Sequence, residues 1–300
     1  MYDLLILGSG PAGIAASIYA YRYRLKTLTI GEIAGGTITE AHDIENYPGV
    51  GKITGIKLGD KMIEQAKNLG CEIINEKVQD VKKITSGFEV QTGKEKYKAK
   101  RILIATGCER KRLVVPGEER LTGRGVSYCA ACDGFFFKKK KVAVIGGGDA
   151  AITSAIYLAD IAEKVTLIIK KTSFHSEPYW IEKLKAAPNV KILTNSDVRQ
   201  IDGEEKVESI TLKNGRKMKL DGVFIEVGSN PNDLLLTQLG VKRDNDGYIF
   251  VNKKLKTNKK GVWAAGDVTH QEFKFRQIVT AAAEGALAAY SIFLDTKKKS

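Results

Sequence analysis

The chain has few of the residues that bind metals or build disulfide frameworks. Its 300 residues include four cysteines and three histidines. Four unevenly spaced cysteines are too few for a secreted disulfide scaffold. Cys129 and Cys132 form a Cys-x-x-Cys pair, but no second pair of ligands has the spacing of a zinc site. The sequence therefore predicts no structural metal, and it favours a catalytic dithiol.

A signal peptide and a long apolar run are also missing. No uninterrupted apolar stretch reaches the roughly 18 residues that a membrane span needs. The first three residues lead directly into an apolar strand, which is not how a signal peptide begins. We therefore expect a fold that starts near the first residue, no membrane segment and a cytoplasmic location.

Acidic residues are outnumbered by basic ones. The chain carries 48 Lys and Arg against 35 Asp and Glu, a formal net charge of +13, and the excess gathers partly at 138–141, 253–260 and 297–299. Such a balance suits an acidic partner, either a small protein or nucleic acid, but it also suits a solvated Lys-rich surface. Because no zinc finger, RNA-binding aromatic motif or basic zipper accompanies the charge, nucleic acid is the weaker expectation.

Two segments share a pattern of apolar strand, glycine turn and helix. Residues 3–13 run into apolar positions at helical spacing, and residues 141–151 run into a helix-like stretch that ends at Ala159. Each is followed by another apolar strand, at 27–30 and 165–169. The pattern predicts an α/β fold with two Rossmann-like β-α-β nucleotide-binding domains on parallel sheets. We also expect a strand at 261–268 and a helix at about 277–294.

The first glycine turn has the spacing of a dinucleotide site. Gly8, Gly10 and Gly13 form Gly-x-Gly-x-x-Gly, which lets the backbone approach a pyrophosphate at the N-terminus of the following helix. Glu32 follows the next strand at about the 20-residue offset of a carboxylate that binds ribose hydroxyls. The strand, the turn, the helix and the acid together predict a bound dinucleotide.

The Cys129-Ala130-Ala131-Cys132 segment has the spacing of a redox dithiol. A gap of two residues lets both sulfurs reach disulfide distance if the segment forms one helical turn. Exchange needs an attacking thiolate and a resolving thiol, and the pair supplies both. Asp133 follows directly and is placed either as a general acid or base or as a cap for the next turn. Cys71 and Cys108 are expected to be structural thiols.

Further motifs follow one another in a set order along the chain, at residues 8–13, 35–36, 45–49, 105–107, 123–134, 146–149, 227–232, 264–268, 276–277 and 280–282. In this order they resemble the low-molecular-weight thioredoxin reductases. The most specific match is Cys-Ala-Ala-Cys-Asp-Gly at 129–134.

The resemblance implies a homodimer whose FAD-binding domain is discontinuous. Residues 1–113 and 244–300 would form that domain. Residues 114–243 would form an NAD(P)H-binding-type domain that carries the dithiol, with hinges near 113–117 and 240–246. The residues implied around FAD are Gly8, Ser9, Gly10, Pro11, Ala12, Gly13, Glu32, Gly35, Gly36, Thr37, Asn46, Thr106, Gly107, Asp267, Arg276 and Gln277. The resemblance also implies that Cys132 is the flavin-proximal sulfur and that Cys129 attacks the disulfide of a thioredoxin or glutaredoxin-like protein.

The second glycine turn departs from the family pattern in the residues that follow it. Gly146, Gly148 and Asp149 keep the pyrophosphate cradle. NADPH-specific relatives show His-Arg-Arg-x-x-x-Arg after the next strand, where this chain has Lys170 and Lys171 in place of the paired arginines and His175 in place of the last one. Two lysines offer positive charge to a 2′-phosphate but not the bidentate fork of arginine. In addition, Thr153-Ser154 replaces a common Glu-Glu pair, and Thr37 stands where glutamine is usual.

The resulting hypothesis is a thioredoxin reductase-like flavoenzyme. Electrons would pass from NADPH through FAD and the Cys129/Cys132 disulfide to a thioredoxin-like protein. The departures in the second nucleotide site also resemble family members that take electrons from ferredoxin, and NADH is a third possible donor. A hypothesis of another class is a flavin redox sensor without turnover or a basic nucleic-acid-binding protein. The presence of both cysteines and Asp133 argues against it.

Overall fold

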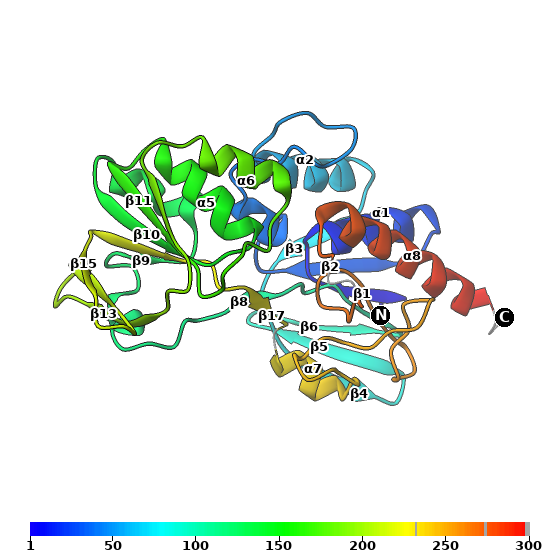
Figure 1. Ribbon diagram of the computed structural model, residues 1–300. Helices are drawn as coiled ribbons and strands as arrows, with labels where there is room; N and C mark the ends of the chain where they lie inside the picture. The colour runs from blue at the N-terminus through cyan, green and yellow to red at the C-terminus, as the bar shows by residue number, and fades with distance from the viewer. Residues whose placement is uncertain (232, 273–274, 298–300) are drawn as a thin grey trace. The chain divides into compact units, whose positions relative to one another are not determined.

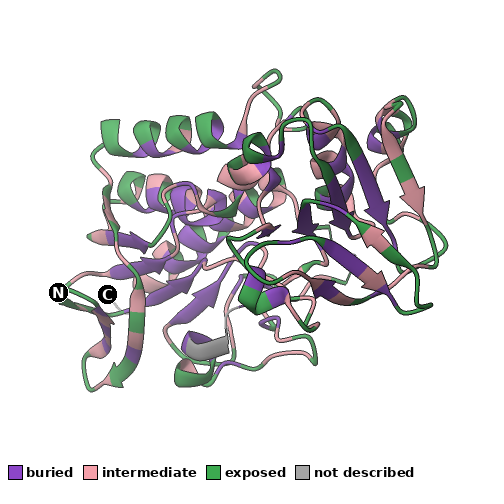
Figure 2. Cartoon of the chain, turned by 90° about the vertical axis from the view of Figure 1, so that its left-hand side faces the viewer, coloured by how far each residue is buried: buried purple, intermediate pink, exposed green. Residues whose placement is uncertain are grey.

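The computed structural model describes residues 1–231, 233–272 and 275–297 (Figure 1). The chain divides into two compact units. Unit 1 consists of Met1–Thr39, Ile44–Glu109 and Asn230–Ser300, and unit 2 consists of Glu40–Asp43 and Arg110–Ser229. Each unit contains a parallel sheet of buried strands, which Figure 2 shows in purple. The predicted α/β fold with two Rossmann-like units, the second inserted into the first, is confirmed.

The parallel sheet of unit 1 has the strand order β18-β7-β1-β2-β3. Its strands are β1 (Leu4–Leu7), β2 (Thr27–Gly31), β3 (Glu72–Asn75), β7 (Ile102–Ile104) and β18 (Val262–Ala264). The central strands are apolar at successive positions because both faces of the sheet are covered, one by helices and the other mainly by an antiparallel sheet. The helices of this unit include α1 (Pro11–Arg22), α2 (Gly55–Asn68) and α8 (Ile278–Lys297).

Helix α8 packs along α1, as Figure 1 shows. The approach is so close that a Cβ at Gly285 would lie 2.0 Å from the carbonyl oxygen of Ala12. By length and composition alone α8 could cross a membrane, although Glu284 lies within it and interrupts its apolar stretch. Since its buried side contains Ala281, Ala288 and Ile292 in one cluster with the sheet, we interpret it as a core helix.

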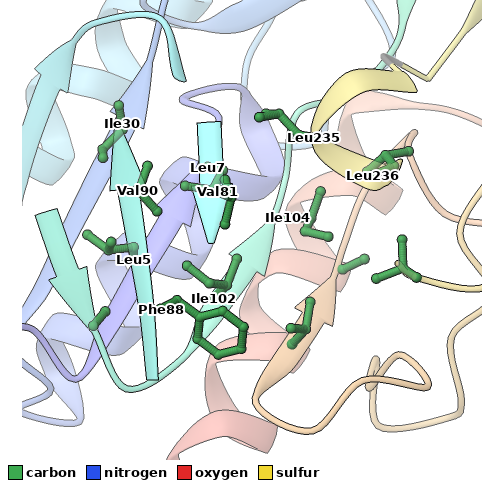
Figure 3. Close-up of a cluster of buried hydrophobic side chains, with 14 of the residues drawn as sticks. Leu5, Leu7, Ile30, Val81, Phe88, Val90, Ile102, Ile104, Leu235 and Leu236 are labelled. Atoms are coloured by element: carbon green, nitrogen blue, oxygen red, sulfur yellow. The ribbon is translucent and has the colours of Figure 1, made fainter. Parts of the chain in front are cut away.

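A second, antiparallel sheet completes unit 1. It consists of β4 (Val78–Ile84), β5 (Gly87–Thr92) and β6 (Lys96–Ala99), and α7 (Asp233–Leu239) packs against β4. Leu235 and Leu236 of α7 are buried in one cluster with Leu5 and Ile104 of the parallel sheet. Figure 3 shows both leucines beside Ile104. Residues near 235 therefore belong to the core of unit 1.

Unit 2 repeats the arrangement of unit 1. Its parallel sheet has the order β12-β11-β10-β16-β9. The strands are β9 (Val126–Ser127), β10 (Lys141–Ile145), β11 (Lys164–Ile168), β12 (Val190–Leu193) and β16 (Gly222–Ile225). Unit 2 also contains the helices α5 (Asp149–Ala159) and α6 (Pro178–Lys185). A small antiparallel sheet consists of β13 (Val198–Asp202), β14 (Ser209–Leu212) and β15 (Lys217–Lys219).

Apart from Glu40–Asp43, the chain passes between the units within two short strands, β8 (Glu109–Arg110) and β17 (Ser229–Asn230). The boundary predicted after residue 113 lies close to the first crossing. The boundary predicted after residue 243, with a hinge at 240–246, is wrong. Residues 230–243 belong to unit 1 because Leu235, Leu236 and Val241 are buried in its core.

Candidate functional site

The first glycine turn connects β1 to α1. Gly8 has φ +115, and a Cβ there would lie 2.1 Å from the carbonyl oxygen of Ala105, while a Cβ at Gly13 would lie 1.9 Å from that of Gly8. These two glycines are therefore required by the turn itself. At Gly10 the nearest atoms to an added Cβ are 3.8 Å away, in Gly35 and Gly36. A Cβ at Gly10 would therefore fit in ordinary van der Waals contact with these two residues.

The N-terminus of α1 is suited to an anion. Its N-cap is Gly10, and within the described residues no side chain caps the helix and no acid lies in its first turn. The first backbone N–H groups of the helix, after Pro11, therefore remain available, and the helix dipole favours negative charge there. Ala12 lies in the same turn, and the Ser9 hydroxyl donates to the carbonyl oxygen of Ile33.

Other residues predicted for FAD gather at the same turn. The N–H of Gly35 donates to the carbonyl oxygen of Ser9 at 3.1 Å, and Gly36 lies against Gly10. Thr106, next to Gly107, packs behind Gly8, and its Oγ1 is buried with no hydrogen-bond partner among the described residues. A buried hydroxyl in this position fits a site completed by a ligand.

Two pairs of predicted residues, far apart in sequence, are brought together. Asn46 Nδ2 donates to Gln277 Oε1 at 3.1 Å, and Arg276 Nε donates to the carbonyl oxygen of Asp267 at 3.3 Å. Burial raises the pKa of Asp267 to about 6, although Arg276 acts in the opposite direction. Glu32, by contrast, is exposed and pairs with a lysine.

Two residues beside Asp267 and Arg276, namely Tyr248 and Glu284, were not identified from the sequence. The Arg276 guanidinium lies 3.8 Å from the centroid of the Tyr248 ring. Glu284 accepts from the backbone N–H of Gly266 at 2.7 Å, which fixes the turn that carries Asp267. A single acid in an otherwise apolar stretch of α8 is the signal that could have identified Glu284. Thr37 is exposed in the short helix η1 (Gly36–Glu40).

The predicted dithiol is present as a disulfide in unit 2. The sulfurs of Cys129 and Cys132 are 2.19 Å apart and their Cα atoms 5.3 Å apart. The segment forms the single turn α4 (Ala130–Asp133), and Cys129 is its N-cap. Cys129 Sγ accepts the backbone N–H of Cys132 at 3.2 Å. That bond would stabilise negative charge on Cys129 after reduction.

Asp133 is held by a serine that the sequence analysis did not identify. Ser127 Oγ donates to Asp133 Oδ2 at 2.6 Å and accepts the backbone N–H of Cys129 at 3.0 Å. Ser127 is buried on β9, two residues before the first cysteine. The backbone N–H of Cys129 and the carboxylate of Asp133 are therefore both hydrogen-bonded to the Ser127 hydroxyl.

A second buried carboxylate contacts the residue before the dithiol. Glu118, in the short helix α3 (Glu118–Leu121), accepts the Tyr128 hydroxyl at 2.6 Å and the backbone N–H of Leu113 at 2.8 Å. Burial, and next the bond to Glu118, raise the pKa of Tyr128 to about 12. Tyr128 therefore stays a neutral donor over the physiological range.

The second glycine turn connects β10 to α5. A Cβ at Gly146 would lie 2.2 Å from the carbonyl oxygen of Glu226, and Gly148 is the N-cap of α5. Asp149 Oδ1 accepts the Ser176 hydroxyl at 2.5 Å and the backbone N–H of Glu177 at 2.9 Å. These bonds fasten the segment after β11 to the turn where a dinucleotide pyrophosphate would lie.

The two lysines predicted for the 2′-phosphate have different surroundings. Lys170 Nζ lies 3.4 Å from a carboxylate oxygen of Asp197. Lys171 Nζ lies 2.9 Å from His175 Nε2. His175 donates its backbone N–H to the carbonyl oxygen of Gly147, so the pair lies beside the glycine turn. The ammonium of Lys171 therefore lies against a ring nitrogen of His175, while Lys170 shares the carboxylate of Asp197 with Lys213.

Glu226, at the end of β16, is a further group that the sequence did not reveal. Its side chain is 2% exposed, pairs with Arg110 and accepts the Ser154 hydroxyl at 3.1 Å. Arg110 also pairs with Glu40 at 2.6 Å. Burial raises the pKa of Glu226 to about 7, and Arg110 counteracts it. In an open α/β sheet this carboxyl end of the strands is where ligands bind.

The remaining two cysteines are thiols. Cys71 is half-buried, and Cys108 is buried with its Sγ 3.3 Å from the carbonyl oxygen of Asp267. Cys108 therefore lies beside one of the residues predicted for FAD. Within the part of the chain that the structure describes, no group of His, Cys, Asp and Glu side chains has the arrangement of a metal site.

Two dinucleotide-binding folds, one of which carries a Cys-x-x-Cys disulfide, define a nucleotide-linked disulfide oxidoreductase. The family model of pyridine nucleotide-disulphide oxidoreductases matches residues 2–285, and the chain belongs to this family. The thioredoxin reductase of Bacillus subtilis (strain 168) is 41% identical over 304 residues, which cover 97% of this chain and 94% of the relative. Within the family, the chain is a thioredoxin reductase-like flavoenzyme.

Solved structures agree with this placement. The crystal structure of Lactococcus lactis thioredoxin reductase matches with a TM-score of 0.93 at 34% identity, covering 98% of this chain and all 100% of the other. A ferredoxin-flavin thioredoxin reductase from Clostridium acetobutylicum matches with a TM-score of 0.54 at 33% identity, covering 99% and 98%. The relatives therefore include enzymes whose names differ in the electron donor.

Proposed function

We propose that this flavoenzyme passes electrons from NADPH through FAD and the Cys129/Cys132 disulfide to the disulfide of a thioredoxin-like protein. The observation that carries the proposal is the Cys129–Cys132 disulfide, built as one helical turn in the unit that also contains the second glycine turn. That unit can hold a nucleotide and a redox dithiol on one scaffold. Homodimerisation and a cytoplasmic location are parts of the same proposal.

The exchange chemistry uses both sulfurs and one carboxylate. Two electrons convert the disulfide to a dithiol. The Cys129 thiol gives its proton to Asp133, and the thiolate attacks one sulfur of the partner disulfide, whose other sulfur leaves and takes a proton. Cys132 then loses its proton and attacks Cys129, which re-forms the internal disulfide, and the second partner sulfur leaves and takes a proton. The partner gains the two electrons that the dithiol loses.

Residues of unit 1 support FAD. Gly8, Gly10 and Gly13 with the uncapped start of α1 would hold the pyrophosphate, and the buried Thr106 hydroxyl fits a cofactor contact. When bound, FAD supplies two-electron redox chemistry between the donor and the disulfide. The other residues proposed around it are Ser9, Pro11, Ala12, Glu32, Gly35, Gly36, Thr37, Asn46, Gly107, Asp267, Arg276 and Gln277.

NADPH is favoured as the donor by the Lys171–His175 pair. A phosphate beside Lys171 would meet a fixed positive charge, and the ring of His175 lies next to that ammonium as a further polar group. Gly146, Gly148 and Asp149 form the turn that would hold the pyrophosphate, with Lys170 nearby. NADH lacks the 2′-phosphate, so it would gain nothing from this pair.

The surface beside the dithiol suits an acidic protein partner. Phe135 and Phe136 follow the dithiol by a few residues and are 72% and 69% exposed. Lys138 and Lys139, also exposed, come next in the chain. Exposed aromatic side chains flanked by cations are typical of a docking surface. A thioredoxin or glutaredoxin-like protein with an acidic rim would fit it.

For the homodimer, the outer side of α8 offers an apolar surface. Leu287, Tyr290 and Leu294 are exposed at helical spacing, and Tyr23 of the neighbouring segment stacks on Phe293. A second copy could bury these side chains, which a monomer leaves in water.

Anaerobic reduction of the FAD-loaded protein tests the donor. NADPH, NADH and reduced ferredoxin are added separately, and bleaching of the flavin is followed. We expect NADPH to bleach fastest, and Lys171→Ala and His175→Ala to remove most of its advantage over NADH. Lys164→Ala is the matched control, because Lys164 is an exposed lysine at the start of β11. Equal rates with NADPH and NADH would refute the proposed role of the pair.

Reduced ferredoxin is the second candidate donor. The net charge of +13 suits an acidic electron carrier, and the Clostridium acetobutylicum relative is named for ferredoxin. Bleaching by ferredoxin with none by either nicotinamide nucleotide would replace NADPH as the donor and leave the dithiol chemistry unchanged.

A further inference from the structure

Ser127 is hydrogen-bonded both to the backbone of Cys129 and to the carboxylate of Asp133. It lies on β9, where its backbone is in register with Phe224 of β16, and its side chain is buried. Its hydroxyl oxygen is 2.6 Å from Asp133 Oδ2 and 3.0 Å from the backbone nitrogen of Cys129. The same oxygen lies 3.3 Å from the carbonyl oxygen of Cys129.

The direction of these bonds follows from the groups involved. A hydroxyl has one proton to donate and can accept as well. The backbone N–H of Cys129 can only donate, so the Ser127 oxygen accepts there. Its proton is then directed to Asp133, at a separation typical of a charge-assisted O–H···O⁻ bond. Ser127 therefore ties the position of Asp133 to the backbone of Cys129.

We propose that Ser127 is the positioning residue that holds the Asp133 carboxylate for proton transfer to and from the Cys129/Cys132 dithiol. This inference rests on the proposed role of Asp133. Asp133 lies at the end of a single helical turn, where its side chain could adopt other rotamers. The bond to Ser127 selects the one in which the carboxylate is tied, through the serine hydroxyl, to the backbone of Cys129, so that little reorganisation precedes the exchange step.

Two proton transfers depend on the position of the Asp133 carboxylate. In the first, the Cys129 S–H bond breaks and the proton moves to Asp133 as the thiolate attacks the partner disulfide. In the second, the partner sulfur that leaves takes that proton from Asp133. Misplacement of the carboxylate would slow both steps and would leave the electron balance unchanged.

The test is a double-mutant cycle on the single exchange turnover. The FAD-loaded protein is reduced with dithiothreitol, freed of it and mixed with bis(2-hydroxyethyl) disulfide. Maleimide quenching and mass spectrometry then give the rate of disulfide formation. Loss of general acid–base assistance in Asp133→Asn should slow the reaction about 10²-fold. Ser127→Ala should slow it about tenfold in the wild-type background but less than about twofold in Asp133→Asn.

A matched variant separates positioning from a loss of folding. Ser127→Thr keeps the hydroxyl on a strand position that suits threonine, and its rate should return to within about threefold of wild type. A full rate in Asp133→Asn would refute the proposed role of Asp133, and with it the role of Ser127. If Asp133→Asn is slow, three results would overturn the Ser127 proposal alone. These are a normal rate in Ser127→Ala, rate losses that multiply fully in the double variant, or a Ser127→Thr variant that is as slow as Ser127→Ala.

Discussion

The hydroxyl of Tyr128 donates a 2.6 Å hydrogen bond to Oε1 of Glu118, whose two carboxylate oxygens also accept the backbone N–H groups of Leu113, Val114 and Val115. Three of these four donors belong to one loop, and the fourth directly precedes the dithiol. One buried carboxylate therefore fixes both segments.

Removal of the Tyr128 hydroxyl should destabilise the protein. We expect Tyr128→Phe to lower the free energy of unfolding by about 1.5–3 kcal/mol, as for a buried hydrogen bond to a charged group. Glu118→Gln should lower the free energy of unfolding by more than Tyr128→Phe does, because its amide would direct N–H groups toward backbone N–H donors. Thermal unfolding followed by circular dichroism measures both. A Glu118→Gln variant as stable as wild type would contradict this account.

Val114 has a backbone conformation that suits glycine. Its φ is +58, and its side chain is 85% exposed, so little packing depends on it. The left-handed region costs an L-residue about 1–2 kcal/mol, while glycine adds about 0.5–1 kcal/mol of unfolded-state entropy. Val114→Gly should therefore stabilise the protein, by up to about 1.5 kcal/mol. A rise of a few degrees in the thermal midpoint checks it.

Gly117 provides the opposite case in the same loop. Its φ is +88, and a Cβ there would lie 1.9 Å from the carbonyl oxygen of Ile201. Gly117→Ala should lower the thermal midpoint. If Val114→Gly and Gly117→Ala shifted the midpoint in the same direction, backbone strain would not be the cause.

The main elements of both sheets could be predicted because each combines an apolar strand, a glycine turn and a helix in consecutive residues. The boundary after residue 243 was wrong for a physical reason. Leu235 and Leu236 would suit the core of either unit, and only the folded chain shows that they pack with Leu5 and Ile104. Local sequence does not encode which core an apolar helix joins.

In the candidate site, too, some residues could be predicted from the sequence and others could not. Its glycines and cysteines have characteristic spacings, so they could be found from the sequence. Ser127, Glu118 and Glu226 act through buried polar contacts that have no sequence signature. Arg110 and Glu226 are 116 positions apart in the chain, and no local pattern links them. Such partners become visible only when strand pairing brings them together.

Two glycines of the first turn should respond differently to alanine. Gly10 has φ −79 and room for a Cβ without a clash, so Gly10→Ala should leave the apoprotein stable but weaken FAD binding. At Gly13 the added methyl group would collide with Gly8, so Gly13→Ala should destabilise the apoprotein itself. Thermal unfolding without FAD and fluorescence titration with FAD separate the two effects. Unchanged FAD affinity in Gly10→Ala would place the pyrophosphate elsewhere.

Glu226 should make stability depend on pH. Burial raises its pKa from 4.5 to about 7, so the folded protein binds this proton more tightly than the unfolded chain. The contribution of the group is therefore fully present below the unfolded pKa and is lost as the pH rises through about 7. Glu226→Gln should show a smaller loss of thermal stability than wild type between roughly pH 5 and roughly pH 8. Glu119→Gln, at a 91% exposed side chain, is the control and should follow wild type.

The two cysteines should differ in the intermediate that they trap. Cys129 Sγ accepts the backbone N–H of Cys132, which would stabilise a thiolate on Cys129. In Cys132→Ser the attacking sulfur remains and the resolving one is gone, so a mixed disulfide with thioredoxin should accumulate. In Cys129→Ser no such species should accumulate. Non-reducing electrophoresis after incubation with an oxidised thioredoxin detects the mixed disulfide.

Because Cys132 is the more exposed of the two residues, accessibility alone would favour it as the nucleophile. Accumulation in Cys129→Ser instead would therefore show that accessibility outweighs the hydrogen bond and would reverse the two roles.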